Sequence, residues 1–275
     1  MATKAILITG CSSGIGLHCA LELQREGYQV LATARQTQDV DKLIELGLTA
    51  HQLDLADPAS VEAGFNWAVN QAEDGIYALF NNGAYALPGA LEDVTRAQLK
   101  CLFETNVFGW HQLTNLCIEH MLEHKQGRII QNSSVLGLVA MKFRGAYNAS
   151  KYAIEGLSDT LRLELRHTNI YISLIEPGPI LSKFRANALM QFEQNIDVNN
   201  SRFAQTYQKM LSRLKKEGPG MAFTEGPESV LKRVRHALNA KQPQARYYVT
   251  KPTYFIGLMR RILPTKWLDQ LVKNF

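Results

Sequence analysis

The sequence has no long uninterrupted run of apolar residues, although 46% of its 275 residues are hydrophobic. A helix that spans a bilayer needs about 20 predominantly apolar residues, so no membrane-spanning segment is predicted. The opening residues MATKAILITG hold one lysine, no cleavage site and an apolar run too short for a signal peptide. We therefore expect a cytoplasmic (cytosolic) protein, with a core large enough for one large α/β domain or two small ones.

Cysteine is scarce, and the four cysteines show neither metal-ligand spacing nor the pattern of a disulfide framework. They are Cys11, Cys19, Cys101 and Cys117. Unpaired thiols are typical of a reducing compartment. The sequence predicts no metal site.

The sequence also has little excess of charge of one sign, because 30 Lys and Arg residues and 25 Asp and Glu residues give a net charge of +5. No basic stripe interleaved with aromatic residues is present, so we expect no nucleic-acid partner. Part of the excess lies near the C-terminus, in LSRLKK, KRVRH and MRRILPTK. A solvated basic face explains these clusters, and an anionic ligand or a membrane surface is the alternative.

Short aliphatic runs alternate with segments of helical spacing along most of the chain. The predicted strands are residues 5–10, 28–35, 49–55, 76–82, 127–134, 169–178 and 245–250. The predicted helices are residues 17–27, 39–47, 57–73, 95–124, 145–167 and 227–240. Because each parallel return needs a crossover, this order predicts an α/β fold: a doubly wound parallel sheet of about seven strands, a Rossmann fold, with helices on both faces. No linker or repeat interrupts it, so we expect one domain over residues 1–275.

Regular alternation fails between residues 179 and 226, a segment too long for an ordinary connection. Its helical pieces, such as AQTYQKMLSRLKKEG, predict a lid near residues 180–225 that covers a ligand crevice. Its apolar residues either line an apolar substrate site or pack internally: Phe184, Leu189, Met190, Phe192, Phe203 and Met210. The apolar and basic tail over residues 254–275 is predicted to be a docked final helix, with a membrane surface or the pocket mouth as its alternative location.

Three glycines follow the first predicted strand in TGCSSGIG: Gly10, Gly14 and Gly16. Glycines at a turn from strand to helix let the backbone approach a pyrophosphate, which binds amide groups at the positive end of the helix. At the end of the second strand, where a fold that binds NAD usually has a carboxylate, the chain has Ala34 followed by Arg35. A guanidinium pairs with a 2′-phosphate, so NADP(H) is favoured over NAD(H), with a solvated arginine as the alternative.

The segment from Ser133 to Lys151 holds a candidate proton-transfer group. Tyr147 follows Ser134 by thirteen residues, and Lys151 follows Tyr147 by four, so tyrosine and lysine share a helix face. A nearby ammonium stabilises phenolate and lowers the pKa of a tyrosine toward neutrality, where acid–base catalysis is efficient. The Ser134 hydroxyl is placed to hold a substrate oxygen.

Seven motifs occur in the order and spacing of the short-chain dehydrogenase/reductase family, which the chain resembles from Ala5 to about Gly178. They are TGCSSGIG, LDLAD, FNN, TNVFG, QNSS, YNASK and EPG. The chain is similar to bacterial members near the retinol dehydrogenase and 17β-hydroxysteroid dehydrogenase branch, which includes NADP-dependent aldehyde reductases. One departure is Gly83-Ala84, where the family usually has Ala-Gly.

The resemblance implies roles for four catalytic residues. Tyr147 would donate the proton to a carbonyl oxygen, or accept one in alcohol oxidation. Lys151 would lower the pKa of Tyr147 and bind the nicotinamide ribose. Ser134 would polarise the carbonyl, and Asn106 would hold a water in a proton relay with Lys151.

The resemblance also implies a cofactor site. Besides Arg35, Tyr147 and Lys151, its members would be Gly10, Ser12, Ser13, Gly14, Ile15, Gly16, Asp54, Leu55, Asn81, Gly83, Pro177, Gly178, Ile180 and Ser182. Asp54 and Leu55 would contact the adenine and Asn81 the adenosine. The residues from Pro177 to Ile180 would line the nicotinamide, and Ser182 would bind its carboxamide. The family's two-fold contact, through helices 95–124 and 145–167, implies a homo-dimer or homo-tetramer.

We therefore expect an NADP-dependent oxidoreductase that interconverts an apolar aldehyde or ketone and its alcohol by hydride transfer. The alternative is a protein that binds NADP(H) as a sensor or scaffold without turnover. A nucleotide-sugar epimerase would usually show Gly-x-x-Gly-x-x-Gly and a larger C-terminal domain, and neither occurs. The physiological substrate, the reaction direction and the choice between dimer and tetramer stay open.

Overall fold

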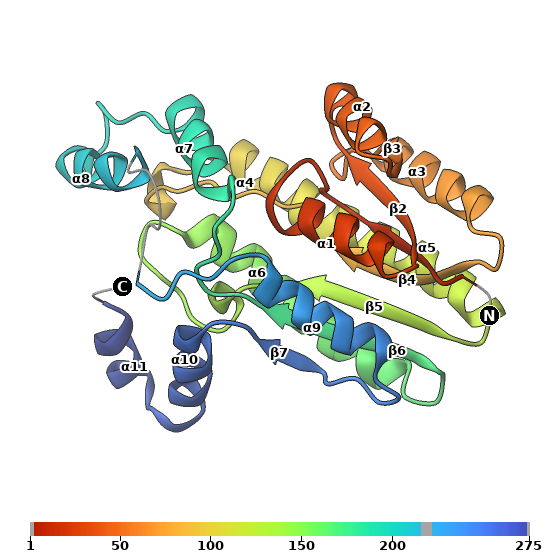
Figure 1. Ribbon diagram of the computed structural model, residues 1–275. Helices are drawn as coiled ribbons and strands as arrows, with labels where there is room; N and C mark the ends of the chain where they lie inside the picture. Colours follow the sequence, from red (N-terminus) through yellow and green to blue (C-terminus); the bar gives the residue numbers. More distant parts are fainter. Residues whose placement is uncertain (1–2, 216–221, 274–275) are drawn as a thin grey trace.

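Within residues 3–215 and 222–273, which the computed structural model describes, seven strands form one parallel sheet in the order β3-β2-β1-β4-β5-β6-β7 (Figure 1). The strands are β1 (Ala5–Ile8), β2 (Gln29–Ala34), β3 (Thr49–Gln52), β4 (Ile76–Asn81), β5 (Gly127–Asn132), β6 (Ile170–Glu176) and β7 (Arg246–Tyr248). Every neighbouring pair is parallel. The predicted doubly wound sheet is confirmed. Its order reverses between β1 and β4, which is where such sheets bind ligands at the carboxyl ends of the strands.

Helices cover both faces of the sheet (Figure 1). They are α1 (Gly14–Arg25), α2 (Thr37–Glu45), α3 (Pro58–Gln71), α4 (Arg96–Phe103), α5 (Gly109–Glu123), α6 (Gly145–Glu164), α7 (Phe184–Asn195), α8 (Ala204–Lys215), α9 (Glu228–Asn239), α10 (Lys251–Ile262) and α11 (Thr265–Val272). Short turns are η1 (Leu91–Asp93), η2 (Glu104–Phe108) and η3 (Val135–Gly137). One core layer joins the sheet to α1, α2 and α9, and the other joins it to α3, α5 and α6.

Local sequence sets where several of these helices begin. Asp57 caps α3 by accepting a hydrogen bond from the Ala59 amide at 3.0 Å, and proline occupies the first helical position. Thr95 and Gln98 form a capping box before α4, in which each side chain accepts from the other's backbone amide. These contacts satisfy amide groups that a helix leaves without intrahelical partners.

The single long helix predicted over residues 95–124 is widened in the middle. The structure has α4, then the π-helical turn η2, then α5 along one continuous path. Gly109, which opens α5, packs so closely that a Cβ there would lie 2.0 Å from the Leu55 carbonyl oxygen. Turns of this kind inside α-helices are frequent at functional sites, and η2 contains Asn106.

The predicted lid and tail are each a pair of helices. Over residues 180–225 the structure has α7 and α8, whose predicted continuation over residues 216–218 lies outside the described residues. The tail, predicted as one helix, is two: α10 packs on β7 and η3, whereas α11 has no buried residue. The break falls at Leu263 and Pro264, where proline prevents the preceding residue from continuing the helix. Among the described residues no helix is both long and apolar enough to cross a membrane.

Candidate active site

Ser134, Tyr147 and Lys151 lie together at the carboxyl end of β5. Ser134 caps η3, directly after the strand, and accepts a hydrogen bond from the Leu136 amide at 3.1 Å. Tyr147 and Lys151 lie on the first two turns of α6, and both side chains are buried. The Tyr147 ring contacts Phe184 of α7 at 5.4 Å between centroids. The structure thus brings together the three side chains that the sequence predicts for proton transfer.

The electrostatics of this group differ from the simple sequence expectation. Burial raises the pKa of Tyr147, and the hydrogen bond with Ser134 acts in the opposite direction. Burial lowers the pKa of Lys151 to about 7, and the nearby Glu155 carboxylate partly offsets this. Lys151 therefore carries only part of a charge near neutral pH, and Tyr147 keeps its proton. That state fits a tyrosine that donates a proton.

Lys151 is held by contacts that the sequence did not reveal. Its Nζ donates to the Asn132 carbonyl oxygen at 2.8 Å and lies 4.2 Å from the centroid of the Trp110 ring. Trp110 in turn donates from Nε1 to the Gly83 carbonyl oxygen at 2.7 Å. The electron-rich ring face attracts the ammonium and compensates part of its desolvation.

A chain of amide hydrogen bonds links Lys151 to the glycine turn. The Asn132 Nδ2 donates to Asn82 Oδ1 at 2.9 Å, and Asn82 Nδ2 donates to the carbonyl oxygens of Thr9 and Gly10 at 3.0 and 3.2 Å. Sequence reasoning named the neighbour Asn81 and missed Asn82 and Asn132. The alternation of side chains along a strand was the available signal, because adjacent asparagines face opposite sides of the sheet.

The glycine turn fits a dinucleotide pyrophosphate. Gly10 and Gly14 have φ of +70° and +58°, a region that favours glycine. A Cβ at Gly16 would lie 2.3 Å from the Gly10 carbonyl oxygen, so the first turn of α1 lies directly against the loop. The Ser13 side chain does not cap α1. The helix therefore presents its amide groups and its positive dipole end to an anion.

The altered Gly83-Ala84 pair is part of this close packing. A Cβ at Gly10 would lie 2.5 Å from Gly83 Cα, and a Cβ at Gly83 would lie 3.2 Å from the Gly10 amide nitrogen. The Gly83 amide donates to Thr9 Oγ1 at 3.0 Å. The glycine after β4 thus lets the two loops touch through their backbones.

Asn106 lies in η2 with its side chain fully buried. Its Oδ1 accepts from the Tyr85 amide at 3.1 Å, and its Nδ2 donates to the Tyr85 carbonyl oxygen at 2.8 Å and to Ser150 Oγ at 3.2 Å. These contacts tie the loop after β4 to α6 one residue before Lys151. A water relay through Asn106 stays a prediction.

The predicted adenosine contacts fall into two groups. Asp54 is half-buried in the loop after β3, and its Oδ1 accepts from the Ala56 amide at 2.9 Å. Leu55 is buried, with its side chain next to Gly83. Asn81 is fully buried and donates to Thr114 Oγ1 at 3.0 Å, so its side chain faces α5 and not the glycine turn.

Arg35 lies exposed at the carboxyl end of β2. Burial raises the pKa of Tyr85, in the loop after β4, to about 12, and the positive Arg35 guanidinium acts in the opposite direction.

The segment after β6 contacts the glycine turn and the segment from Ser134 to Val139, which we call the catalytic loop. The Pro177 carbonyl oxygen accepts from the Val135 amide at 2.8 Å, one residue after Ser134. A Cβ at Gly14 would lie 2.9 Å from Ser182 Cβ, and one at Gly178 would lie 2.1 Å from Thr250 Oγ1. Ile180 forms a parallel bridge with Glu225. Among the residues after β6 that are predicted to bind the cofactor, Ser182 therefore contacts the glycine turn directly.

A buried acidic cluster lies behind Lys151. Arg246 of β7 forms ion pairs with Glu155 and Asp159 at 3.0 and 2.8 Å, and its Nε lies 3.2 Å from Glu176 Oε1. Ser133 donates a hydrogen bond to Glu155. Burial raises the pKa of Glu176 to about 9, and the neighbouring Glu155 carboxylate acts in the same direction. Three elements, β6, β7 and α6, are thus joined through one arginine.

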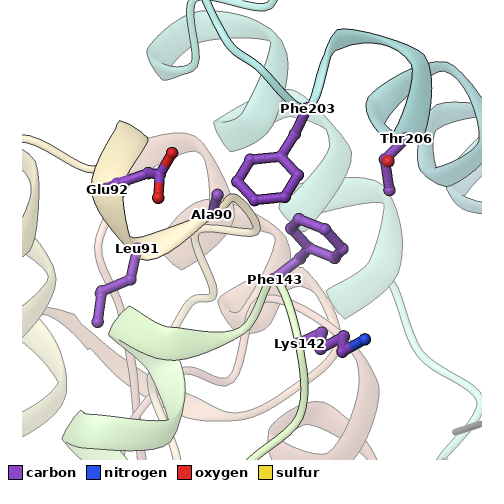
Figure 2. A pocket seen from close by; sticks show the side chains of 7 residues that line it. All are labelled: Ala90, Leu91, Glu92, Lys142, Phe143, Phe203 and Thr206. Atoms are coloured by element: carbon purple, nitrogen blue, oxygen red, sulfur yellow. The ribbon is translucent and has the colours of Figure 1, made fainter. Parts of the chain in front are cut away.

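A cavity of about 470 Å³ lies apart from the predicted catalytic residues. Figure 2 shows the rings of Phe143 and Phe203 side by side among its lining residues, and their centroids are 5.3 Å apart. The lining residues are Ala90, Leu91, Glu92, Lys142, Phe143, Phe203 and Thr206. None of them is a predicted catalytic or cofactor residue. Because Tyr147, Ser134 and Lys151 are the side chains predicted for proton transfer, we place the candidate site at those residues rather than in this cavity.

One group of side chains elsewhere has metal-ligand proximity. Ligand atoms of His120, Glu123 and His124 lie within 4.8 Å of one another. However, His120 Nε2 already accepts a hydrogen bond from the Ile76 amide at 3.0 Å, at the amino end of β4. That nitrogen would have to abandon a backbone amide in order to bind a metal.

Comparison with known families identifies the family of this chain. The family model described as short chain dehydrogenase matches residues 4–193. The chain belongs to the short-chain dehydrogenase family. It is therefore an oxidoreductase on a fold that binds a nicotinamide cofactor, and the resemblance that its motifs carry is confirmed.

Individual relatives agree over nearly the full length. The chain is 42% identical to the uncharacterized oxidoreductase YbbO of Escherichia coli strain K12 over 98% of this chain and 94% of that protein. It is 31% identical to 17-beta-hydroxysteroid dehydrogenase type 1 of Homo sapiens over 94% of this chain and 81% of that protein. A short-chain dehydrogenase/reductase from Burkholderia phymatum, solved in complex with NAD, superposes with a TM-score of 0.78 at 23% identity, covering 99% and 95% of the two chains.

Proposed function

We propose that this short-chain dehydrogenase is an NADP(H)-dependent enzyme that interconverts an apolar aldehyde or ketone and its alcohol, with Tyr147 as the general acid and base. The observation that carries the proposal is the placement of Tyr147 beside Ser134 and Lys151, joined through Asn132 and Asn82 to a glycine turn that fits a pyrophosphate.

The chain's own residues supply the proton and the orientation. When bound, the nicotinamide supplies the hydride for the carbonyl carbon. Tyr147 donates its phenolic proton to the carbonyl oxygen as negative charge develops there, and the product is an alcohol. The Ser134 hydroxyl, which lies beside Tyr147, orients the same oxygen. Burial of Tyr147 excludes water from the transfer.

Lys151 stabilises the charge that develops on Tyr147 in this proposal. Its position one helical turn after Tyr147 allows the charged form of the amine to stabilise a developing phenolate. Its Asn132 contact fixes the side chain in that position. Because its pKa is about 7, small changes in its surroundings shift its charge in the physiological range.

Arg35 supports NADP(H) as the cofactor. A guanidinium at the end of β2 pairs with a 2′-phosphate, and Ala34 offers no carboxylate for a ribose hydroxyl. The Burkholderia phymatum relative was solved with NAD, so NAD(H) is the competing cofactor to be tested.

The residues around Tyr147 support an apolar substrate. Phe184 contacts the Tyr147 ring, and both Phe184 and Met190 of α7 are exposed, at 37% and 45%. In contrast, Phe192, Phe203 and Met210 belong to the packed interior between α7, α8 and η1. We assign Phe184 and Met190 to the substrate side and the other three to internal packing. The similarity to a 17-beta-hydroxysteroid dehydrogenase supports a steroid-like ketone as one class to test.

The outer faces of the middle helices support assembly into a homo-oligomer. Phe108, Leu122, Tyr152 and Leu163 expose 51%, 46%, 38% and 60% of their surface on η2, α5 and α6. Exposed apolar side chains gathered on neighbouring helices mark protein contacts. Light scattering of the full chain before and after Leu163→Gln would test this inference, with a fall in mass as the expected result.

The decisive experiment measures oxidation of NADPH and NADH in the presence of aldehydes, ketosteroids and retinal. Tyr147→Phe is expected to keep NADPH binding while lowering kcat by about 100-fold or more, the contribution of general acid catalysis. Tyr171→Phe, near the start of β6, is the matched control and should keep full activity. Full turnover by Tyr147→Phe would reject the assigned acid, and binding of NADPH without turnover of any substrate would favour a sensor or scaffold.

A further inference from the structure

The last two helices concentrate the positive charge of the whole protein. Residues 251–273 contain five basic residues and one acidic residue, Asp269. The basic residues are Lys251, Arg260, Arg261, Lys266 and Lys273. This net charge of +4 compares with +5 for all 275 residues. The rest of the molecule is close to neutral, so the charge is local to α10 and α11.

α10 has one face toward the protein and another toward solvent. Thr253, Ile256 and Gly257 are buried. Tyr254, Phe255, Leu258 and Ile262 are 50%, 47%, 55% and 61% exposed. At 3.6 residues per turn, these four side chains fall with Lys251 and Arg261 within about 120° of one another around the helix axis. The outward face is therefore a row of large apolar side chains with a cation near each end.

α11 extends this face. Trp267 is 68% exposed, and Lys266 beside it is exposed as well. Leu268 and Val272 pack instead against the cluster of Val135, Val139 and Ile256. The helix is thus attached through one side and presents an indole ring and a cation on the other. In Figure 1, α10 and α11 lie side by side at one edge of the molecule, beyond β7. We call the exposed side chains from Lys251 to Trp267 the tail face.

Charge decides which occupant the tail face fits. A symmetric contact between two copies would place the same basic patch against itself, and like charges would repel. An anionic phospholipid surface offers negative headgroups to the cations and an acyl boundary to the apolar row, and indole and phenol rings are enriched at that depth. We propose that the tail face docks this protein on an anionic membrane surface without crossing the membrane.

The docking face adjoins the catalytic loop. Arg260, on the inner side of α10, donates to the Gly137 carbonyl oxygen at 3.3 Å, three residues after Ser134. Ile256 packs on Val135 and Val139 of the same loop. A protein docked through this face holds its catalytic loop next to the lipid. If the proposed function also holds, an apolar carbonyl compound dissolved in the bilayer reaches Tyr147 over a short path.

Co-sedimentation of the full chain with vesicles tests the docking. The probes are vesicles of phosphatidylcholine alone and vesicles with roughly one-third phosphatidylserine. We expect at least about tenfold stronger binding to the anionic vesicles, weakening as salt rises from about 0.1 M to about 0.5 M. Leu258→Gln/Ile262→Gln should lower that binding about tenfold or more, because both side chains are exposed and the fold does not need them.

The control is Ile44→Gln/Leu46→Gln, two side chains around the end of α2 with similar exposures of 54% and 53%. This pair should bind vesicles as the unchanged chain does. Equal binding to both vesicle types, no binding to either, or full binding by the tail variant would overturn the proposal. A fall in oligomer mass of the tail variant without a change in vesicle binding would assign the face to another copy of the chain. None of these readouts depends on turnover, so the docking can fail while the proposed activity stands.

Discussion

Two parts of the protein lie next to the predicted catalytic residues, the glycine turn (the glycine wall) and the α7–α8 pair (the second wall), and different kinds of contact hold each in place. On the glycine side, Gly10 lies against Gly83 and Gly16 lies against the Gly10 carbonyl oxygen, so backbone touches backbone. On the side of α7 and α8, rings pack against one another, with Phe192 and Tyr207 at 5.1 Å, and the Tyr207 hydroxyl bonds the loop at Asp93. The first wall has no space for one methyl group. In the second wall the aromatic rings can shift against one another, and the stability of this wall depends on its polar contacts.

The glycine wall should be disrupted by the smallest substitution, the addition of one methyl group. A Cβ in Gly16→Ala would lie 2.3 Å from the Gly10 carbonyl oxygen and 2.6 Å from Asn82 Nδ2, so the turn must shift. We expect a loss of NADPH affinity of about 100-fold or more, as for other misplacements of about 1 Å. Fluorescence titration with NADPH measures it. The control is Gly156→Ala in α6, where a Cβ would meet nothing within 4 Å. It should raise stability by roughly 0.5–1 kcal/mol, and unchanged affinity in Gly16→Ala would contradict the fit of the turn.

Arg35, at the end of β2, should determine whether the protein prefers NADPH or NADH. Arg35→Ala removes a guanidinium that we propose pairs with a 2′-phosphate. A hydrogen bond to a charged group contributes about 1.5–3 kcal/mol, so NADPH affinity should fall about 10- to 100-fold. NADH affinity should change less than about twofold, since NADH has no phosphate at that position. Arg25→Ala, another exposed arginine at the end of α1, is the control. Equal losses for both cofactors would remove the assignment of NADP(H).

The second wall should lose stability without losing cofactor affinity. Tyr207 is fully buried, and its hydroxyl accepts from the Ala90 amide at 2.8 Å while donating to Asp93. Tyr207→Phe leaves that amide without its acceptor, which should lower the free energy of unfolding by about 1–3 kcal/mol. Urea denaturation measures the loss, and NADPH titration should show none. A variant that keeps its stability but binds NADPH poorly would reverse the comparison between the walls.

Apart from both walls, the cluster of Arg246, Glu155, Asp159 and Glu176 should make the stability depend on pH. Burial raises the pKa of Glu176 from an ordinary 4.5 to about 9, so between these values the folded chain holds a proton that the unfolded chain releases. The free energy of unfolding therefore falls as pH rises through this window. Glu176 faces Glu155 and Arg246, and Lys151 lies beyond Glu155 with an opposite dependence above about pH 7. Because Lys151 titrates in every variant, its effect cancels in the comparison.

Glu176→Gln removes the proton exchange and keeps the shape of the side chain. Its free energy of unfolding should rise relative to the unchanged chain between pH 5 and pH 9, by up to about 1.4 kcal/mol per pH unit. Denaturant titrations across this window measure the difference. Glu164→Gln, at an exposed position of α6, should follow the unchanged chain. Parallel curves for Glu176→Gln and the unchanged chain would show that Glu176 does not titrate differently on folding.

Sequence reasoning was most successful where the signal is local. The strand and helix alternation predicted the sheet, and the spacing of Tyr147 and Lys151 placed both on one face of α6. It was least successful where partners are far apart in the chain. Asn82 and Asn132 are 50 residues apart, and Asn82 and Thr9 are 73 apart, so no local pattern marks their hydrogen bonds. Trp110 beneath Lys151 was missed for the same reason.

The sequence by itself determined the order of elements and the glycine turn, and it predicted the residues of the candidate proton-transfer group, because periodicity and turn chemistry act over a few neighbouring residues. Only the tertiary structure decided how deeply Lys151 and Tyr147 are buried, and therefore the direction in which their pKa values move. It also decided that Tyr207 of α8 packs inside while Tyr254 and Phe255 of α10 face solvent. Burial depends on contacts between distant segments, and composition alone does not specify which segments meet.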